Sequence, residues 1–148
     1  MWGMLVSVIS GILMSVQGVF NSEVTKQTSI WIAAAFVQVT AFAVCMAAWF
    51  ATGRESSFGE VISTRPVYLL SGGIIGAFIT YTVIFGMNTL GPAQAVLFII
   101  AAQIISAYLI ELFGMFGVEK SPFHWTKLAG VVLMAAGIII FKWKELRQ

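Results

Sequence analysis

Hydrophobic residues fall in five long runs along the chain, and short polar segments separate them. Each run is about twenty residues long, the length of helix that crosses a hydrocarbon layer of about 30 Å. The runs are continuous, whereas the strands of a membrane β-barrel alternate polar and apolar positions over about ten residues. The pattern therefore predicts five transmembrane helices, at residues 2–21, 30–52, 66–88, 92–113 and 123–143.

The short connections leave no room for a soluble domain, so we expect residues 1–148 to form one all-α transmembrane domain. The first run stands where a secretion signal would, but it lacks a basic leading segment and an A-x-A-like cleavage site, and its apolar stretch is too long. We therefore expect it to be an uncleaved helix.

Composition agrees with this pattern. Hydrophobic residues make up 59% of the chain and charged residues 9%, against about 45–50% and about 25% in soluble domains. The mean hydropathy is +0.96. We expect an integral protein of the cell membrane, and in a bacterium of the inner membrane. The net charge of +2 comes from the ends of the runs and does not indicate nucleic-acid binding.

Lysine and arginine are divided equally between the two sides of the membrane. Five spans put the termini on opposite sides, so each polar segment can be assigned to one side. The side of the N-terminus holds four basic residues, Arg54, Arg65, Lys120 and Lys127. The other side also holds four, Lys26, Lys142, Lys144 and Arg147. The excess of basic residues that normally marks the cytoplasmic side is therefore missing.

Two interpretations of this balance stay open. In the first, the C-terminal sequence KWKELR holds its end in the cytoplasm and fixes one orientation. In the second, copies insert both ways and pair head to tail, so that ten helices are related by a two-fold axis in the membrane plane. Such an antiparallel inverted-repeat dimer would form a binding cavity at its interface, because a single five-helix chain offers little interior.

Polar residues inside the runs are candidates for that cavity, because polar groups in hydrocarbon need a partner or water. Gln17 and Asn21 are four residues apart and share a helix face. At 100° per residue, Gln103 and Glu111 lie about 80° apart on one stripe, and Tyr108 is expected to point away from it. These residues predict where a solute or a proton would bind.

Each of these residues also has a structural interpretation. A buried Glu111 would carry a proton or pair with a cationic solute, whereas an interfacial Glu111 would reach water or pair with Lys120 or Lys127. The three amide side chains could instead join helices through hydrogen bonds worth about 0.6 kcal/mol each.

Small residues recur at four-residue spacing in two runs. Gly11 stands between Ser7 and Ser15, and Gly72 precedes Gly76. Such faces allow close helix packing, and a smooth glycine face would also let the third helix slide.

Aromatic side chains divide by depth. The tryptophans lie near span ends, as in an interfacial belt, at Trp2, Trp31, Trp49, Trp125 and Trp143. Tyr81 and Tyr108 lie deeper and are candidates for a cavity wall.

Catalytic and metal chemistry is not expected. Cys45 is the only cysteine, so no disulfide can form within the chain, and it is interpreted as a small hydrophobic residue. His124 is the only histidine and has no second histidine or cysteine ligand nearby. The sequence contains no G-x-S-x-G, H-E-x-x-H or P-loop pattern. We expect no enzyme activity, no cofactor and no metal.

Four stretches of the chain resemble the YdcZ-like family, the short five-helix branch of the drug/metabolite transporter superfamily. The stretches are SGILMSVQGVFNSEV, SGGIIGAF, LGPAQAVLFIIAAQIISAYLIELFGMFG and KLAGVVLMAAGIIIF. The resemblance covers nearly the whole chain in order, and it depends most on Gln-x3-Asn in the first run and on the Gln and acidic-x-Phe-Gly of the fourth.

The resemblance implies a half-size transporter that pairs with itself or with a sister chain. It aligns Gln17, Asn21, Gln103 and Glu111 with recurring polar positions of the family. The family usually has Asp where this chain has Glu111, which keeps the charge. It usually has Gly where this chain has Ala102. The larger side chain of Ala102 leaves less space for a neighbouring helix at this position.

Together these features favour a secondary transporter that exports a small organic solute by alternating access. Gln17, Gln103 and Tyr81 from both copies would line a midplane cavity, and Glu111 would bind the proton or cation. Two alternatives are a passive channel made by the same dimer, whose conductance would not saturate, and a non-transporting membrane subunit of a larger assembly.

Overall fold

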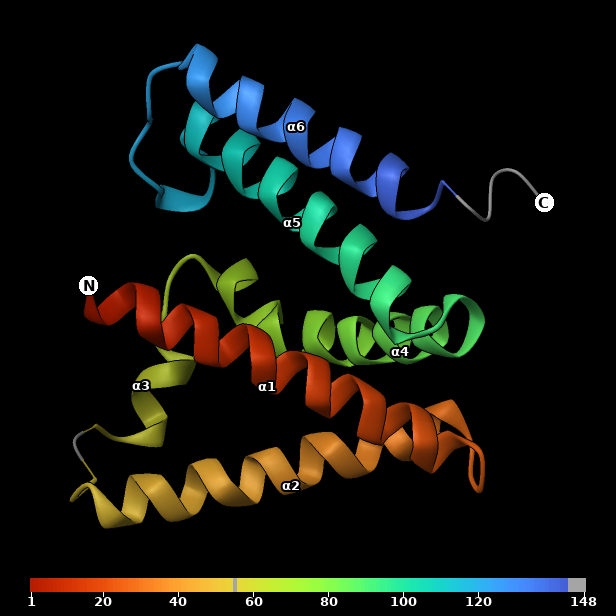
Figure 1. Ribbon diagram of the computed structural model, residues 1–148. Coiled ribbons are helices and arrows are strands. Elements are labelled where there is room, and N and C mark those ends of the chain that lie inside the picture. The colour runs from red at the N-terminus through yellow and green to blue at the C-terminus, as the bar shows by residue number, and fades with distance from the viewer. Residues whose placement is uncertain (55, 144–148) are drawn as a thin grey trace. The chain divides into compact units, whose positions relative to one another are not determined.

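The computed structural model describes residues 1–54 and 56–143, and all regular elements among them are helices (Figure 1). The chain forms two compact units, Met1–Pro92 and Ala93–Gln148. Each unit has its own packing, and each contains some of the predicted polar residues.

The first unit consists of five helical elements. They are α1 (Trp2–Thr25), α2 (Ile30–Ala51), α3 (Phe58–Ile62), the 3-10 helix η1 (Val67–Ser71) and α4 (Gly72–Leu90). The three long helices α1, α2 and α4 all pack on one another.

Local sequence signals explain where these helices begin and end. The Ser29 hydroxyl accepts a hydrogen bond from the Ile32 N–H at 3.2 Å, which caps the start of α2. Ser57 and Glu60 form a capping box at the start of α3. At the end of α4, Gly91 adopts a φ of +81°, a conformation that favours glycine, and its N–H donates to the Met87 carbonyl.

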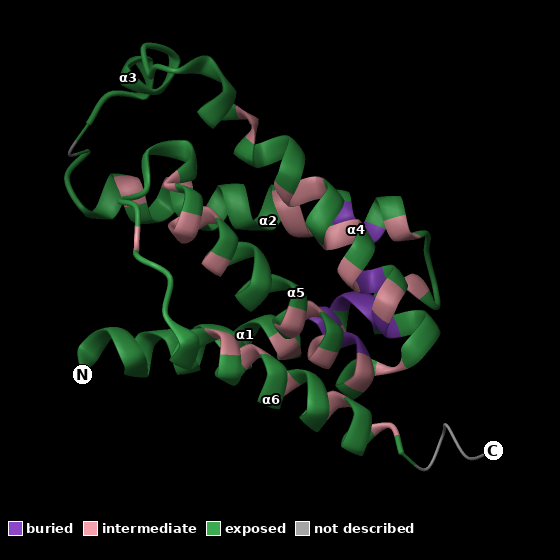
Figure 2. Ribbon diagram, turned by 90° about the horizontal axis from the view of Figure 1, so that it is seen from above, coloured by how far each residue is buried: buried purple, intermediate pink, exposed green. Residues whose placement is uncertain are grey.

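The buried residues of this unit gather at one end of its helices (Figure 2). They come from the last turns of α1, the first turns of α2 and the last turns of α4: Gly18, Asn21, Ser22, Ala33, Ala34, Ile84 and Met87. A Cβ atom added at Gly18 would overlap the Met87 methyl group and lie 2.6 Å from its sulfur. Glycine at this position therefore lets α1 and α4 approach closely, as small residues do between membrane helices.

The second unit is a helical hairpin, α5 (Pro92–Phe113) and α6 (Trp125–Phe141), with the short 3-10 helix η2 (Met115–Gly117) in its connection. Gly114 follows α5 with a φ of +64°. The connection returns to α5 through a 2.9 Å hydrogen bond from the Ser121 N–H to the Glu111 carbonyl. At the other end, the Lys142 ammonium lies 5.3 Å from the centre of the Phe98 ring. The two helices therefore run antiparallel along each other.

The helices match four of the predicted spans in length and composition. Apolar helices of 22–24 residues cover Trp2–Thr25, Ile30–Ala51, Val67–Leu90 and Pro92–Phe113. The first ends four residues later than predicted, and the third begins as a 3-10 helix. The apolar helix Trp125–Phe141 is shorter, at 17 residues. The all-α membrane class is confirmed, whereas five spans per chain and the ten-helix dimer stay predictions.

Most apolar side chains of the four long helices are exposed. In the most apolar window of each helix, no more than 11% of the residues are buried within the chain. Exposed apolar surface on this scale needs lipid or another protein chain to cover it.

Candidate functional site

An open groove of about 750 Å³ runs along α1 and α2. On α1 it is lined by residues at helical spacing, mainly Ser10, Leu13, Met14, Gln17, Phe20 and Asn21. On α2 its lining is Val37, Thr40, Ala41, Val44 and Cys45. The prediction that Gln17 and Asn21 share a helix face is confirmed, because both side chains line this groove.

The two amides of the groove have no hydrogen-bonding partner. Neither the Gln17 nor the Asn21 side chain makes a hydrogen bond within residues 1–54 and 56–143. Gln17 is exposed to the groove, whereas Asn21 is only 8% exposed. Among the described residues, no fully buried side-chain nitrogen or oxygen lacks a hydrogen-bonding partner, so both amide heads keep some exposure and can bind a ligand that enters the groove.

Tyr81 lies outside this groove. Its ring stacks on Trp31 with 4.6 Å between the centroids and 28° between the planes, so it joins α4 to α2. Trp31 was predicted to lie in an interfacial belt, and it lies at the first turn of α2. The structure of this unit therefore does not bring Tyr81 together with Gln17 and Asn21.

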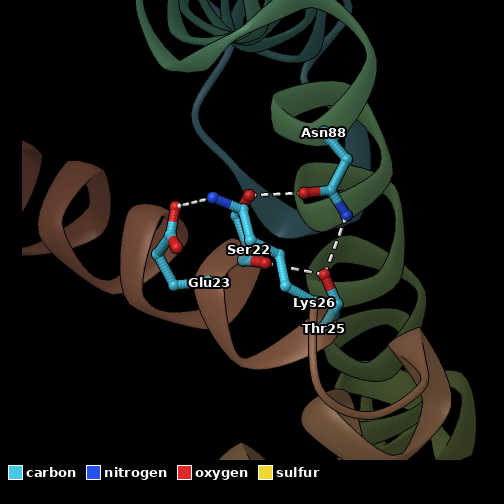
Figure 3. A network of polar contacts seen from close by, with 5 residues as sticks. All are labelled: Ser22, Glu23, Thr25, Lys26 and Asn88. Carbon is cyan, nitrogen blue, oxygen red and sulfur yellow. Dashed lines mark hydrogen bonds and ion pairs between the residues drawn. The ribbon is translucent and has the colours of Figure 1, made fainter.

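A polar network joins the ends of α1 and α4 (Figure 3). The Ser22 hydroxyl donates to the Asn88 Oδ1 at 2.5 Å, and the Asn88 Nδ2 donates to the Thr25 hydroxyl at 2.9 Å. Glu23 pairs with Lys26 at 2.6 Å beside this network. The sequence did not single out Ser22 or Thr25, and it did not pair either of them with the intramembrane residue Asn88. The available signal was their position at the ends of two helices, which does not reveal that the two ends meet.

The charged pair of the chain's second unit lies between α5 and α6. The Lys127 ammonium is 2.9 Å from a Glu111 carboxylate oxygen and donates to the Ser121 hydroxyl at 3.4 Å. It also lies 5.3 Å from the centre of the Tyr108 ring. This arrangement is the Glu111–Lys127 pairing that the sequence left open. The two side chains are 47% and 41% exposed, so the pair lies at the surface of the hairpin.

Glu111 and Lys127 belong to an open groove of about 630 Å³ along the hairpin. Its lining is Ile104, Ala107, Tyr108 and Glu111 from α5, with Lys127, Gly130, Val131 and Met134 from α6. The prediction that Tyr108 points away from Glu111 was wrong, because three residues at 100° each leave the two side chains only about 60° apart.

Gln103 does not line the hairpin groove. It is exposed on α5 and its side chain makes no hydrogen bond among the described residues. Gln103 and Glu111 therefore do not line the same groove, although they lie only about 80° apart around the helix axis.

The predicted packing glycines have different surroundings. A Cβ atom at Gly76 would lie 3.4 Å from the Gln38 amide nitrogen, so α2 covers this position. Cβ atoms at Gly11 and Gly72 would meet nothing within 4 Å. Any close packing on these two glycines must come from beyond the unit that contains them. In the part of the chain that the structure describes, no three His, Cys, Asp or Glu side chains could hold a metal ion together.

Comparisons with known proteins bear on the location and the family. A family model described as "Putative inner membrane exporter, YdcZ" matches residues 2–140. The inner membrane protein YdcZ of Escherichia coli strain K12 is 25% identical over 134 residues, 88% of this chain and 87% of the relative. The comparison with solved structures found no match. With four helices of membrane length, these matches place the chain in the inner membrane as a multi-pass protein.

Proposed function

The chain belongs to the YdcZ family of inner-membrane proteins, and on that premise we propose that it is a secondary transporter that exports a small organic solute. The family description and the printed name of the relative support a membrane exporter in general terms. The solute, the coupling and the assembly are parts of the proposal.

The observation that carries the proposal is the pair of unpartnered amides in the α1–α2 groove. Gln17 and Asn21 line an apolar groove of about 750 Å³, within the range of about 300–1,000 Å³ that is usual for small-molecule sites. Such sites combine apolar walls with a few polar groups that fix the orientation of the ligand. This groove is the proposed solute site.

Glu111 is the proposed proton site. Its carboxylate lies 2.9 Å from the Lys127 ammonium, and both groups are partly exposed on the hairpin. Protonation of Glu111 would break this ion pair and release Lys127. Exchange of protons for the solute would drive export.

Two copies of opposite orientation are the proposed assembly, with an identical chain or a sister chain as partner. The four-to-four division of basic residues supports insertion both ways. The open surroundings of Gly11 and Gly72, the exposed Gln103 and the largely exposed apolar helices leave surface for a second copy. In this dimer α6 is the fifth span, since 17 residues are the lower limit for crossing a bilayer. Alternating access would then follow from rocking of the two copies.

Transport by the purified full-length chain in proteoliposomes tests the proposal. The vesicles carry a proton gradient, and a panel of labelled cationic, anionic and uncharged solutes is screened for flux. We expect saturable flux of at least one solute, weakened by Gln17→Leu and by Asn21→Leu. Gln38→Leu is the matched control, because Gln38 lies on α2 outside the groove.

Other outcomes identify the other functions. Flux that rises linearly with solute concentration, without response to the proton gradient, would indicate a channel. No flux of any solute would indicate a non-transporting subunit.

The orientation is tested separately with two fusions after residue 148, a fluorescent reporter active only in the cytoplasm and an enzyme active only after export. Strong signal from both fusions is expected for insertion both ways. Signal from only one would mean a fixed orientation and would require an oppositely oriented sister chain.

A further inference from the structure

Among the residues that the structure describes, no charged side chain lines the α1–α2 groove. Its polar lining residues are two amides and two hydroxyls, on Gln17, Asn21, Ser10 and Thr40. Its remaining lining is aliphatic, aromatic or sulfur-containing. The nearest charges along α1, Glu23 and Lys26, pair with each other at 2.6 Å and do not line the groove.

The polar groups of the groove differ in what they can offer a ligand. The Thr40 hydroxyl already donates to the carbonyls of Phe36 and Val37, at 2.9 and 3.0 Å, so only its lone pairs are free. Gln17 and Asn21 are unpartnered, and each offers an N–H donor and a carbonyl acceptor. Ser10 is also free within the described chain.

These groups suit a ligand of one electrostatic class. A charged ligand in an apolar site needs a counter-ion, because an unpaired charge loses its hydration without compensation. The described lining supplies no counter-ion of either sign, but it supplies both hydrogen-bond donors and acceptors. A neutral head group that both donates and accepts, such as an amide or a hydroxyl, would satisfy Gln17 and Asn21 together.

We propose that the α1–α2 groove binds an uncharged organic solute with an apolar body and an amide-like or hydroxyl head group. This inference depends on the function proposed above, in which the groove is the solute site. The proton is then bound by Glu111, which pairs with Lys127 in the hairpin, and the solute crosses the membrane as an uncharged molecule.

Cys45 makes the test possible in the native chain. It is the only cysteine, it is exposed and it lines the groove, so N-ethylmaleimide should alkylate it. Ligands in the groove should slow this reaction. Benzamide, benzamidinium and benzoate are suitable probes, because they share a phenyl ring and a planar head group and differ in charge.

The expected protection follows from the size of the probe. A ligand of nine non-hydrogen atoms at about 0.5 kcal/mol per atom binds with a Kd of about 0.5 mM, so about 5 mM benzamide slows alkylation about tenfold. Benzamidinium and benzoate at the same concentration should slow it less than about twofold. Protection by benzamide should be lost in Gln17→Leu and kept in Gln38→Leu, which also controls for partition of the probe into lipid.

Two results would overturn the inference. The first is equal or better protection by benzamidinium or benzoate, and the second is no protection by benzamide in the native chain. If a charged probe protects and Gln17→Leu abolishes its effect, the groove is still the solute site and only the solute class is wrong. If no probe protects and Gln17→Leu leaves solute transport unchanged, the proposed function fails as well.

Discussion

The α1–α2 groove and the hairpin groove differ in the state of their polar groups. Along α1 and α2, Gln17 and Asn21 are unpaired, and none of the described lining residues is charged. Along α5 and α6, Glu111 and Lys127 satisfy each other at 2.9 Å. Unpaired amides can bind a solute without loss of a hydrogen bond within the protein. A charged group in an ion pair can bind a ligand only after the ion pair has separated. The comparison suggests that solute recognition and charge handling belong to different helices.

The largest effect is expected from removal of the Glu111 carboxylate. With one proton exchanged per solute, a gradient of two pH units drives an accumulation of about 100-fold, because each unit is worth a factor of ten. In Glu111→Gln we expect accumulation to fall to about 1, since no proton is carried. Solute accumulation in proteoliposomes measures this ratio.

Lys127→Gln is the matched control for that substitution. Both variants break the same ion pair, but only Glu111→Gln removes the titratable group. We expect Lys127→Gln to keep proton-driven accumulation. Loss of accumulation in both variants alike would mean that the ion pair itself, and not the carboxylate, is required.

The net charge moved in each transport cycle tests whether the solute is uncharged. If the α1–α2 groove takes an uncharged solute and Glu111 one proton, each cycle moves one net charge across the membrane. One charge crossing 100 mV is worth about 2.3 kcal/mol, so an imposed potential of about 60 mV should change accumulation about tenfold. Potassium and valinomycin set the potential in vesicles, and accumulation that ignores it would argue for a singly charged cationic solute.

Within the α1–α2 groove, the free and the engaged polar groups should respond differently. Asn21→Leu replaces an unpartnered amide with an apolar side chain of similar shape. We expect solute affinity to fall about fivefold, because one lost hydrogen bond is worth about 1 kcal/mol. Thr40→Val removes a hydroxyl that already donates to two backbone carbonyls. Its effect should stay below about twofold in the same binding assay, and a larger loss would show that Thr40 is a solute contact.

The smallest expected effect concerns the network at the ends of α1 and α4. Ser22→Ala and Asn88→Ala should each cost about 0.6 kcal/mol of stability, the usual value for a hydrogen bond between membrane helices. A double-mutant cycle followed by unfolding in detergent should give a coupling of similar size. Neither residue lines the α1–α2 groove or the hairpin groove, so solute affinity should not change, and a change would mean that the network acts on the solute site.

Much of the fold followed from the apolar runs. A run of about twenty apolar residues has few stable structures in a bilayer apart from a helix, because every backbone polar group must be satisfied internally. The limits of α2 and α5 were accordingly predicted to within a residue. The added turn of α1 was missed, since the sequence through Thr25 is polar and gives no hydrophobic signal. The short helix α3 lies in a loop and depends on the Ser57 and Glu60 capping box.

The sequence by itself determined the membrane class, the four long apolar helices and the shared face of Gln17 and Asn21, because each depends on the composition of one segment or on the geometry of one helix. Only the tertiary structure decided which polar residues have partners. In the tertiary structure Glu111 forms an ion pair with Lys127, the Tyr81 ring stacks on Trp31, and Ser22 donates a hydrogen bond to Asn88. Those choices depend on how neighbouring helices pack, and the spacing of residues along one chain does not contain that information.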